Sequence, residues 1–332
     1  MKRIFLIVLL SIGFLCAQQH TIKMATVAPD GSFWMKELNR VEESVANQTN
    51  GMIDFKIYAS GVQGDEIEML RKMKLKQLDA ASFTGVGLGK IVPDIRIFEV
   101  PFLFRNIEEI DYVKEKLFDY FQQKFMEKGY YMAAWAEVGF VYLFTKDKVQ
   151  TKDDLSKIKM WLWKGDPLAK TVFDILNIPA VPLPINDVYT SLQTGLIDGV
   201  YISPYGAMAL QWFTKTNYIM DYPLTYSIGA VLINQNKLNS IPEKERNIFI
   251  EETRQSMQKI VKKSREDNKE TLKILQDNGM KLVDITDEAR NTYREAGIET
   301  QNRLAGKLYS EDILNRVLQL LEEYRSDTTN QK

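Results

Sequence analysis

The chain has 332 residues, a formal charge of −1, and a composition of 45% hydrophobic and 26% charged residues. This composition is typical of a globular protein, and the length favours two domains because single cores rarely grow beyond about 250 residues. A net charge near zero supplies no basic field for nonspecific nucleic-acid binding. We therefore expect a large globular protein that does not bind nucleic acid.

The first 17 residues are typical of an export signal. Lys2 and Arg3 give a positive start, an apolar run covers residues 4–15, and Ala17 offers a small residue for cleavage. The apolar run is shorter than the roughly 20 residues that cross a bilayer, and we expect no membrane span elsewhere. Cleavage after Ala17 would release a periplasmic protein, whereas cleavage before Cys16 would leave a lipoprotein anchor. The large Leu15 side chain favours the first alternative.

Strand-like and helix-like patterns alternate at the start of the mature chain. Residues 21–27 alternate as a strand does, and residues 33–47 have helical spacing. Residues 52–58 are again strand-like, and residues 64–76 place apolar side chains on one helical face. This order predicts an α/β domain in which helices cover a mostly parallel sheet.

A related pattern recurs in the middle of the chain. A helix ending at Leu75 is followed by Asp79 at the start of a strand, and a helix ending at Gly195 is followed by Asp198 in the same role. Each strand leads into a loop of small or aromatic residues. Because open α/β sheets bind ligands at the carboxyl ends of their strands, the repeat predicts two similar domains with a cleft between these loops. The repeat is short, and chance similarity is the alternative.

The last third is dominated by a long helical pattern. Residues 240–243 resemble a capping box with an early proline, and Gly279 can end the helix after Asn278. At 1.5 Å per residue such a helix is roughly 54 Å long, enough to lie along two domains. An interrupted helix is the alternative. Residues 281–285 then form a predicted strand, followed by helices to about residue 324.

The residue inventory argues against an enzyme. The single histidine, His20, lies at the start of the mature chain, a poor place for a buried base or a zinc ligand. The glycines at 85, 87 and 89 match neither phosphate-binding pattern, and we expect a flexible cleft loop there. No acidic run has calcium-ligand spacing. We predict no catalytic residue, no metal and no cofactor, and a carboxylate-based enzyme is the less favoured alternative.

Four segments closely resemble the DctP-type solute receptors of tripartite ATP-independent periplasmic (TRAP) transporters. Residues 101–106 read Pro-Phe-Leu-Phe-Arg-Asn and residues 191–199 read Ser-Leu-Gln-Thr-Gly-Leu-Ile-Asp-Gly. Residues 49–51 and 64–70 also match, and the order is kept over essentially the whole mature chain. The resemblance implies a two-domain α/β periplasmic binding protein fold (type II-like), with a long helix spanning both domains and the ligand cleft between them.

The resemblance also implies a role and a domain plan. Such a receptor captures a small organic solute, in this family usually an organic acid, and delivers it to the membrane permease subunits of the transporter. We expect a periplasmic monomer with domain I formed by residues 20–144 and about 226–258. Domain II is expected from residues 145–225 and about 259–328. A ligand-presenting receptor for a sensor kinase is an alternative that the sequence does not separate from this one.

The ligand-binding arginines of these receptors are missing here. Family members hold the ligand carboxylate with an arginine in a segment like Lys-Ile-Arg-Val-Pro, and the matching residue here is Trp161. A second family arginine is replaced by Val141, and Lys164 is the nearest substitute cation, although a solvated lysine is the favoured interpretation. An indole cannot give the bidentate grip of a guanidinium. We therefore expect an aromatic or bulky organic acid, or a neutral or cationic solute, instead of a simple dicarboxylate.

The predicted ligand-binding residues lie at strand ends and helix starts around the expected cleft. Trp161 and Trp163 alternate along one strand and face one side, as a stacking wall or as core residues. For Ser32, the alternative to ligand binding is to cap a helix. For Glu137, the alternative is an ion pair with Lys159. The full predicted set is Ser32, Trp34, Thr84, Trp135, Glu137, Trp161, Trp163, Tyr201, Ser203, Tyr205 and Trp212.

Overall fold

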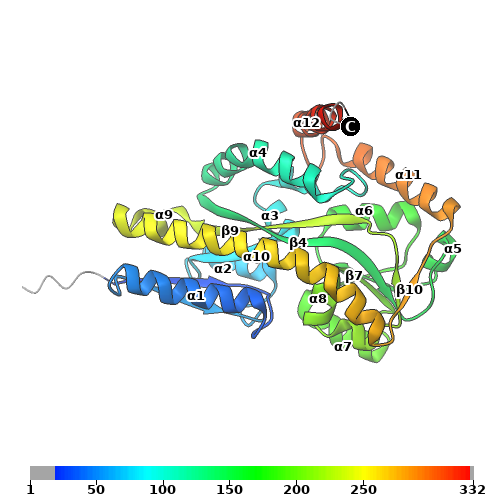
Figure 1. Cartoon of the computed structure of the whole chain (residues 1–332), viewed down its shortest axis with the longest axis horizontal. Coiled ribbons are helices and arrows are strands. Elements are labelled where there is room, and N and C mark those ends of the chain that lie inside the picture. Colours follow the sequence, from blue (N-terminus) through cyan, green and yellow to red (C-terminus); the bar gives the residue numbers. More distant parts are fainter. Residues whose placement is uncertain (1–18, 330–332) are drawn as a thin grey trace, which may run out of the picture.

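The structure is a computed structural model that describes residues 19–329, so the predicted export signal and Cys16 lie outside the described residues. Figure 1 shows two lobes crossed by long shared elements. The strands are β1 (His20–Ala25), β2 (Ile53–Tyr58), β3 (Ala80–Thr84), β4 (Tyr130–Thr145), β5 (Met160–Trp163), β6 (Ala180–Leu183), β7 (Gly199–Ile202), β8 (Tyr218–Met220), β9 (Thr225–Asn234) and β10 (Lys281–Val283).

Helices cover the strands in both lobes. The larger ones are α1 (Phe33–Gln48), α2 (Glu66–Lys74), α4 (Ile107–Glu127), α6 (Pro167–Leu176), α10 (Glu243–Asp277), α11 (Asp287–Leu304) and α12 (Glu311–Thr329). Shorter segments are α3 (Gly85–Gly89), α5 (Lys152–Leu155), α7 (Val188–Thr194), α8 (Pro204–Ala209), α9 (Gln235–Asn239), and the 3₁₀ turns η1 (Pro93–Glu99), η2 (Ile185–Asp187) and η3 (Trp212–Lys215). None of these described helices is long and apolar enough to cross a membrane.

The first lobe contains strands β2, β1, β3, β9 and most of β4, in that order. β1 pairs in parallel with β2 and β3, whereas β3 and β4 both pair antiparallel with β9. Alternation along β1 turns Ile22 and Met24 into a core that α1 closes with Met35, Leu38 and Val41. The amphipathic spacing predicted for residues 33–47 therefore produces the expected covering helix.

The second lobe is built on the carboxyl end of β4. Its last residues, from Tyr142 to Thr145, pair antiparallel with β7, and β5 and β6 continue the sheet beyond β7. β8 pairs with the end of β4, and β10 pairs with β8. Each of the two predicted repeats thus contributes a strand, β3 in the first lobe and β7 in the second.

Three elements join the lobes: β4, β9 and α10. β4 pairs with β9 up to Val141 and with β7 from Tyr142, so one strand belongs to both lobes. The 35-residue α10 packs on α1, on β4 and on α8, and confirms the long helix that spans both domains. Asn268 on α10 ties the crossing together, because its side chain donates to the Val138 carbonyl at 2.9 Å and accepts from the Tyr205 amide at 3.0 Å.

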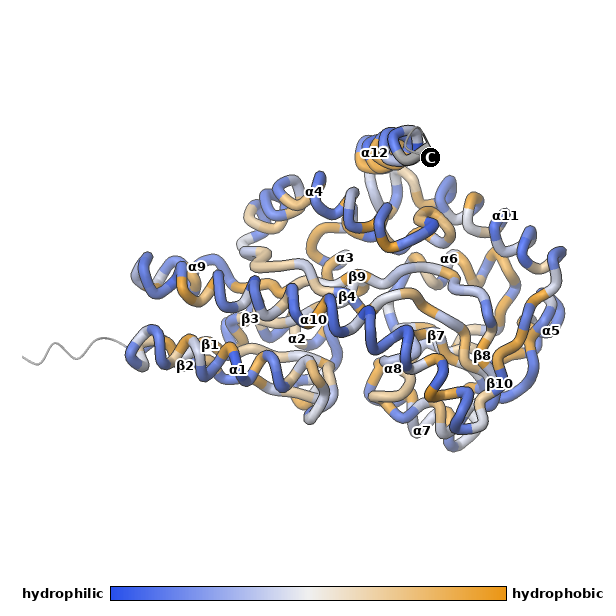
Figure 2. Tube along the Cα trace, in the orientation of Figure 1, coloured by the Kyte–Doolittle hydropathy of each residue, from blue (hydrophilic) through white to orange (hydrophobic). Residues whose placement is uncertain are grey.

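Two features differ from the sequence expectations: the start of α10 and the lobe on which α12 packs. The capping box at the start of α10 is absent, because Ser240 ends α9 and Pro242 occupies the N-cap position without a side-chain bond. The final helix α12 packs on α4 and η1 of the first lobe, whereas α11 packs on α6 of the second. Residues 259–328, all expected in domain II, therefore divide between the two lobes. Figure 2 shows hydrophilic residues along the outer faces of α1, α10 and α11.

Candidate functional site

A cavity of about 220 Å³ lies between the lobes. Residues that follow β1, β3, β5 and β7 reach it, as expected for a ligand site at the carboxyl ends of strands. Its walls are largely apolar, and a few polar groups converge on it, which is typical of small-molecule sites. The apolar side chains include Val27, Val86, Pro101, Val138, Val141, Leu168, Val172, Phe173, Ile185, Leu210 and Leu224.

Most of the residues predicted to bind ligand line this cavity. They are Ser32, Trp34, Thr84, Glu137, Trp161, Trp163, Tyr201, Ser203 and Tyr205. Trp135 lies elsewhere, in an aromatic cluster with Phe98, Phe118 and Phe121 in the first lobe. Trp212 lies one layer behind the wall, with its ring edge-on to Trp161 at 5.2 Å between centroids. The cavity therefore gathers side chains from both lobes.

An aromatic wall belongs to the second lobe. Trp161 is 1% exposed, stacks on Tyr201 with 5.0 Å between ring centroids, and donates from Nε1 to the Leu183 carbonyl at 3.0 Å. Trp163 lies 5.5 Å from Trp161, and its backbone amide donates to the Tyr201 hydroxyl at 3.1 Å. The only hydrogen-bond donor of the Trp161 side chain is thus already bonded within the protein, so Trp161 offers a ligand only apolar surface.

Polar contacts cross from one lobe to the other around the cavity. Trp163 Nε1 donates to both carboxylate oxygens of Asp65, the N-cap of α2, at 3.1 and 3.2 Å. The Phe33 amide donates to the Tyr205 hydroxyl at 3.4 Å, and Lys90 Nζ donates to the Gly165 carbonyl at 2.8 Å. These contacts hold the lobes together over the cavity.

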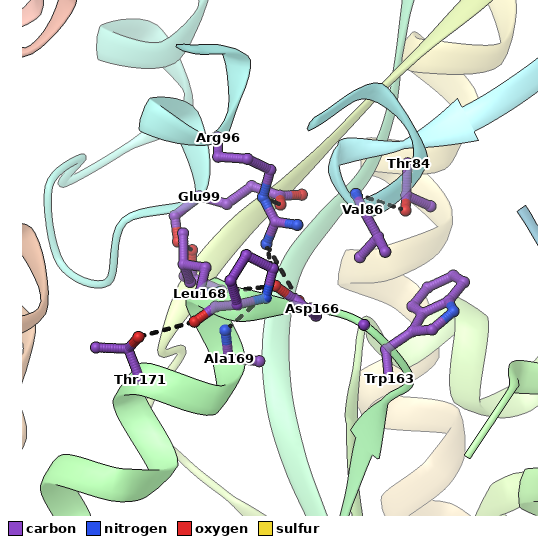
Figure 3. A network of polar contacts seen from close by, with 12 residues as sticks. Thr84, Val86, Arg96, Glu99, Trp163, Asp166, Leu168, Ala169 and Thr171 are labelled. Atoms are coloured by element: carbon purple, nitrogen blue, oxygen red, sulfur yellow. Dashed lines mark hydrogen bonds and ion pairs between the residues drawn. The ribbon is translucent and has the colours of Figure 1, made fainter. Parts of the chain in front are cut away.

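The strongest contact across the cleft is a buried ion pair that the sequence analysis missed. Arg96 of η1, 3% exposed, donates from Nη2 to both carboxylate oxygens of Asp166 at 2.9 and 3.1 Å (Figure 3). Asp166 is 5% exposed and caps α6 by accepting from the amides of Leu168 and Ala169 at 2.9 and 3.3 Å. Arg96 Nε also lies 3.0 Å from a carboxylate oxygen of Glu99. One guanidinium therefore serves two carboxylates.

The electrostatics of this cluster follow from burial and proximity. Burial alone would lower the pKa of Arg96, but the charges of Asp166 and Glu99 raise it above its usual value. Burial raises the pKa of Glu99, and so does the neighbouring charge of Asp166, while Arg96 opposes both. The cluster thus carries one positive and up to two negative charges in a largely apolar cavity.

Three glycines make room for these buried charges. Residues 85–89 form the short helix α3, so the prediction of a flexible loop there is wrong. A Cβ atom at Gly85 would overlap the Glu99 carboxylate, and one at Gly89 would lie 2.7 Å from Cγ and Cδ of Arg96. A Cβ at Gly87 would lie 2.6 Å from an oxygen of Glu66. The alternating glycines were therefore the sequence signal for the cluster.

Glu66 is a second buried acid in the cavity wall. It is fully buried at the start of α2, and its carboxyl group accepts from the Thr84 amide at 2.8 Å, the Thr84 hydroxyl at 3.1 Å and the Gly87 amide at 2.8 Å. Burial raises the pKa of Glu66 to about 8, against these hydrogen bonds, which lower it. Thr84 thus lines the cavity, caps α3 and fixes Glu66 at once.

The other predicted polar residues have partners inside the protein. Glu137 pairs with Lys114 at 3.1 Å and with Arg265 Nη2 at 3.0 Å, so the predicted pair with Lys159 is wrong. Lys159 pairs with Asp198 instead, at 3.2 Å. Lys164 is exposed and does not line the cavity.

Two serines of the predicted set cap helices. The Ser32 hydroxyl accepts from the Met35 amide at 3.3 Å at the start of α1. The Ser203 hydroxyl accepts from the Gly206 amide at 3.2 Å at the start of α8. Both residues also line the cavity, so capping and cavity lining are combined. Within residues 19–329, no group of three or more His, Cys, Asp or Glu side chains is placed to hold a metal ion.

A solute-sized cavity enclosed between two α/β lobes, with two strands and a long helix crossing between them, defines a two-domain periplasmic binding protein. The sequence matches the model of the DctP family, described as bacterial extracellular solute-binding protein, family 7, over residues 24–307. The chain belongs to this family, whose members include the solute receptors of TRAP transporters.

Similar proteins match between about half and most of the chain. The C4-dicarboxylate-binding periplasmic protein DctP of Rhodobacter capsulatus is 24% identical over 307 residues, covering 90% of each chain. A solute-binding protein of Chromohalobacter salexigens is 29% identical, over 49% of this chain and 49% of that relative. The crystal structure of a sugar acid binding protein of Advenella mimigardefordensis, in complex with galactonate, has a TM-score of 0.86 at 20% identity. That match covers 92% of this chain and 99% of the other.

Proposed function

We propose that this protein is the periplasmic receptor of a TRAP transporter, which captures one small organic solute in the cavity and delivers it to membrane permease subunits. The observation that carries the proposal is the cavity itself, enclosed by both lobes at the carboxyl ends of their strands. Family membership and ligand-bound relatives such as the galactonate complex support it. Export through the N-terminal signal would place the receptor in the periplasm.

The cavity favours a solute with a bulky apolar or aromatic body. Its walls present Val27, Val172, Phe173 and Leu224, together with the faces or edges of Trp161 and Trp163. Burial of apolar surface contributes about 25 cal/mol per Å², so a solute of matching shape gains affinity without strong polar contacts. A short dicarboxylate would leave these walls without a partner.

Solute capture also fits the cavity better than turnover does. None of the described lining residues is histidine or cysteine, and the acidic ones are bound to protein groups. Asp166 and Glu137 are held in ion pairs, and Glu66 accepts three hydrogen bonds. A general base needs a free lone pair directed at the substrate. We therefore expect the solute to leave the protein unchanged.

Thermal unfolding against a library of organic acids, amines and neutral solutes tests the proposal. A solute present at about 100 times its dissociation constant should stabilise the mature protein by about 2.7 kcal/mol. Ala209→Trp, at the cavity wall, should abolish the shift, and Ala180→Trp, at an exposed position of β6, should retain it. Mass spectrometry should recover the solute intact. A solute that is chemically converted, or a shift that survives Ala209→Trp, would contradict the proposal.

A further inference from the structure

We infer that the solute of this receptor carries no carboxylate, because the protein's own Asp166 binds the only guanidinium that residues 19–329 place in the cavity. The inference rests on the proposed function and narrows the solute class to apolar-bodied molecules without negative charge. It departs from the carboxylic acids, such as galactonate and succinate, that several similar proteins bind.

The first argument is the charge inventory of the cavity. Among the described residues that line it, Arg96 is the only base, whereas Glu66, Glu99, Glu137 and Asp166 are acids. Glu137 is neutralised by Lys114 and Arg265 behind the wall. Asp166 alone balances the charge of Arg96, whatever the charge of Glu66 and Glu99, so an incoming anion meets no net positive charge. Moving an unpaired anion from water into such a site is costly.

The second argument is the geometry of Arg96. Its Nη2 is within hydrogen-bond distance of both oxygens of Asp166, and its Nε faces Glu99. A ligand carboxylate that bound the same Nη2 atom would have to displace Asp166, which would then lie buried without its cation. Losing one partner of a buried ion pair is strongly destabilising, because the other charge stays buried without compensation. Asp166 also stabilises the first turn of α6, so its displacement would uncap that helix as well.

The third argument is that no other lysine or arginine of the described chain lines the cavity. Lys90 is turned to the rim, where it donates to the Gly165 carbonyl, and Lys164 is exposed. Trp161, at the family's arginine position, uses its one donor on the Leu183 carbonyl. Arg96 and Asp166 thus link the two lobes by a contact within the protein. A receptor that holds its ligand with an arginine makes this contact with the carboxylate of the ligand.

Matched probes with one body and two head groups test the inference. Phenylacetate and phenylacetamide differ in charge and share the aromatic ring, and their dissociation constants are measured by calorimetry on the mature protein. Wild type should bind phenylacetamide at least about tenfold more tightly than phenylacetate, the scale of one charge-assisted hydrogen bond. Asp166→Asn keeps the side-chain oxygen Oδ1 that caps α6, but it removes the negative charge that balances Arg96. It should bind phenylacetate at least about tenfold more tightly than wild type does.

Two further variants make the result decisive. Asp187→Asn also removes a negative charge from a helix N-cap, but at an exposed position outside the cavity, and should leave both dissociation constants unchanged. Asp166→Ser keeps a capping hydroxyl and replaces Asp166→Asn if that variant does not fold. The inference is overturned if wild type prefers phenylacetate, or if neither variant at 166 gains phenylacetate affinity over Asp187→Asn. That outcome would leave the receptor role standing, because the receptor role is tested separately by the library screen and by Ala209→Trp.

Discussion

Glu66 should make the stability of the folded protein fall as the pH rises, and Glu66→Gln should remove that dependence. The carboxyl group is fully buried, and its pKa in the folded protein is about 8, against a usual value of 4.5. A raised acid pKa means that the folded state holds the proton more tightly than the unfolded chain does. The resulting stability is complete below the unfolded pKa and is lost as the pH rises through the folded pKa.

The size of the effect follows from the two pKa values. Each tenfold difference in proton affinity corresponds to about 1.4 kcal/mol, so the free energy of unfolding should decrease by about 4 kcal/mol between about pH 5 and about pH 9. Glutamine resembles the neutral acid in shape, so Glu66→Gln should be close to wild type at the lower pH. At the higher pH it should be the more stable protein.

Chemical denaturation across this pH range provides the assay. The quantity of interest is the difference in unfolding free energy between wild type and Glu66→Gln, which cancels the contributions of all other titrating groups. Glu68→Gln, on the same helix but half-exposed, is the control. Because the hydrogen bond from Arg71 lowers the pKa of Glu68, this variant should run parallel to wild type above about pH 5. Parallel pH profiles for wild type and Glu66→Gln would refute the reasoning and would mean that the three hydrogen bonds keep Glu66 ionised.

Two other substitutions test the packing around the site. Gly89→Ala should lower the unfolding free energy by about 1–3 kcal/mol, because the new Cβ would lie 2.7 Å from Arg96, whereas glycine-to-alanine changes inside helices usually stabilise. A stabilised Gly89→Ala protein in a thermal melt would show that Arg96 can move. Trp161→Ala should cost about 3–5 kcal/mol, because it removes a buried ring stacked on Tyr201. A loss below about 1 kcal/mol in denaturant titration would mean that this wall is not packed as described.

The parts of the fold that were predictable from the sequence depend on local patterns. The apolar stripe of α10 and Gly279 after it indicated one long helix, and the helix spans both lobes. The position of the cavity followed from a general rule about strand ends, applied to β3 and β7. Periodicity within a segment was sufficient for these features. It could not place α12, whose apolar residues Ile313, Val317 and Leu321 pack against the first lobe.

The charged cluster could not be predicted in the same way, because its partners are far apart in the chain. Arg96 lies between Ile95 and Ile97 in a short 3₁₀ turn, a context in which a charged side chain usually points to solvent. Its partner Asp166 is 70 residues away. The resemblance to TRAP receptors showed that an arginine was missing at Trp161, but it could not show where another one was. The glycines of α3 were visible, and only the structure explains them.

The crossing of β4, β9 and α10 also limits how the receptor can open. Because β4, β9 and α10 all pass between the lobes at one place, we expect the lobes to open by bending there. We do not expect them to slide or twist past each other. Asn268 fastens α10 to β4 and α8 at that place, beside Gly139, where β4 changes register and φ is 104°. Bending at this place would move Arg96 in the first lobe away from Asp166 in the second. A receptor that opens in this way would break the ion pair of Arg96 and Asp166 each time its cavity opens to solvent.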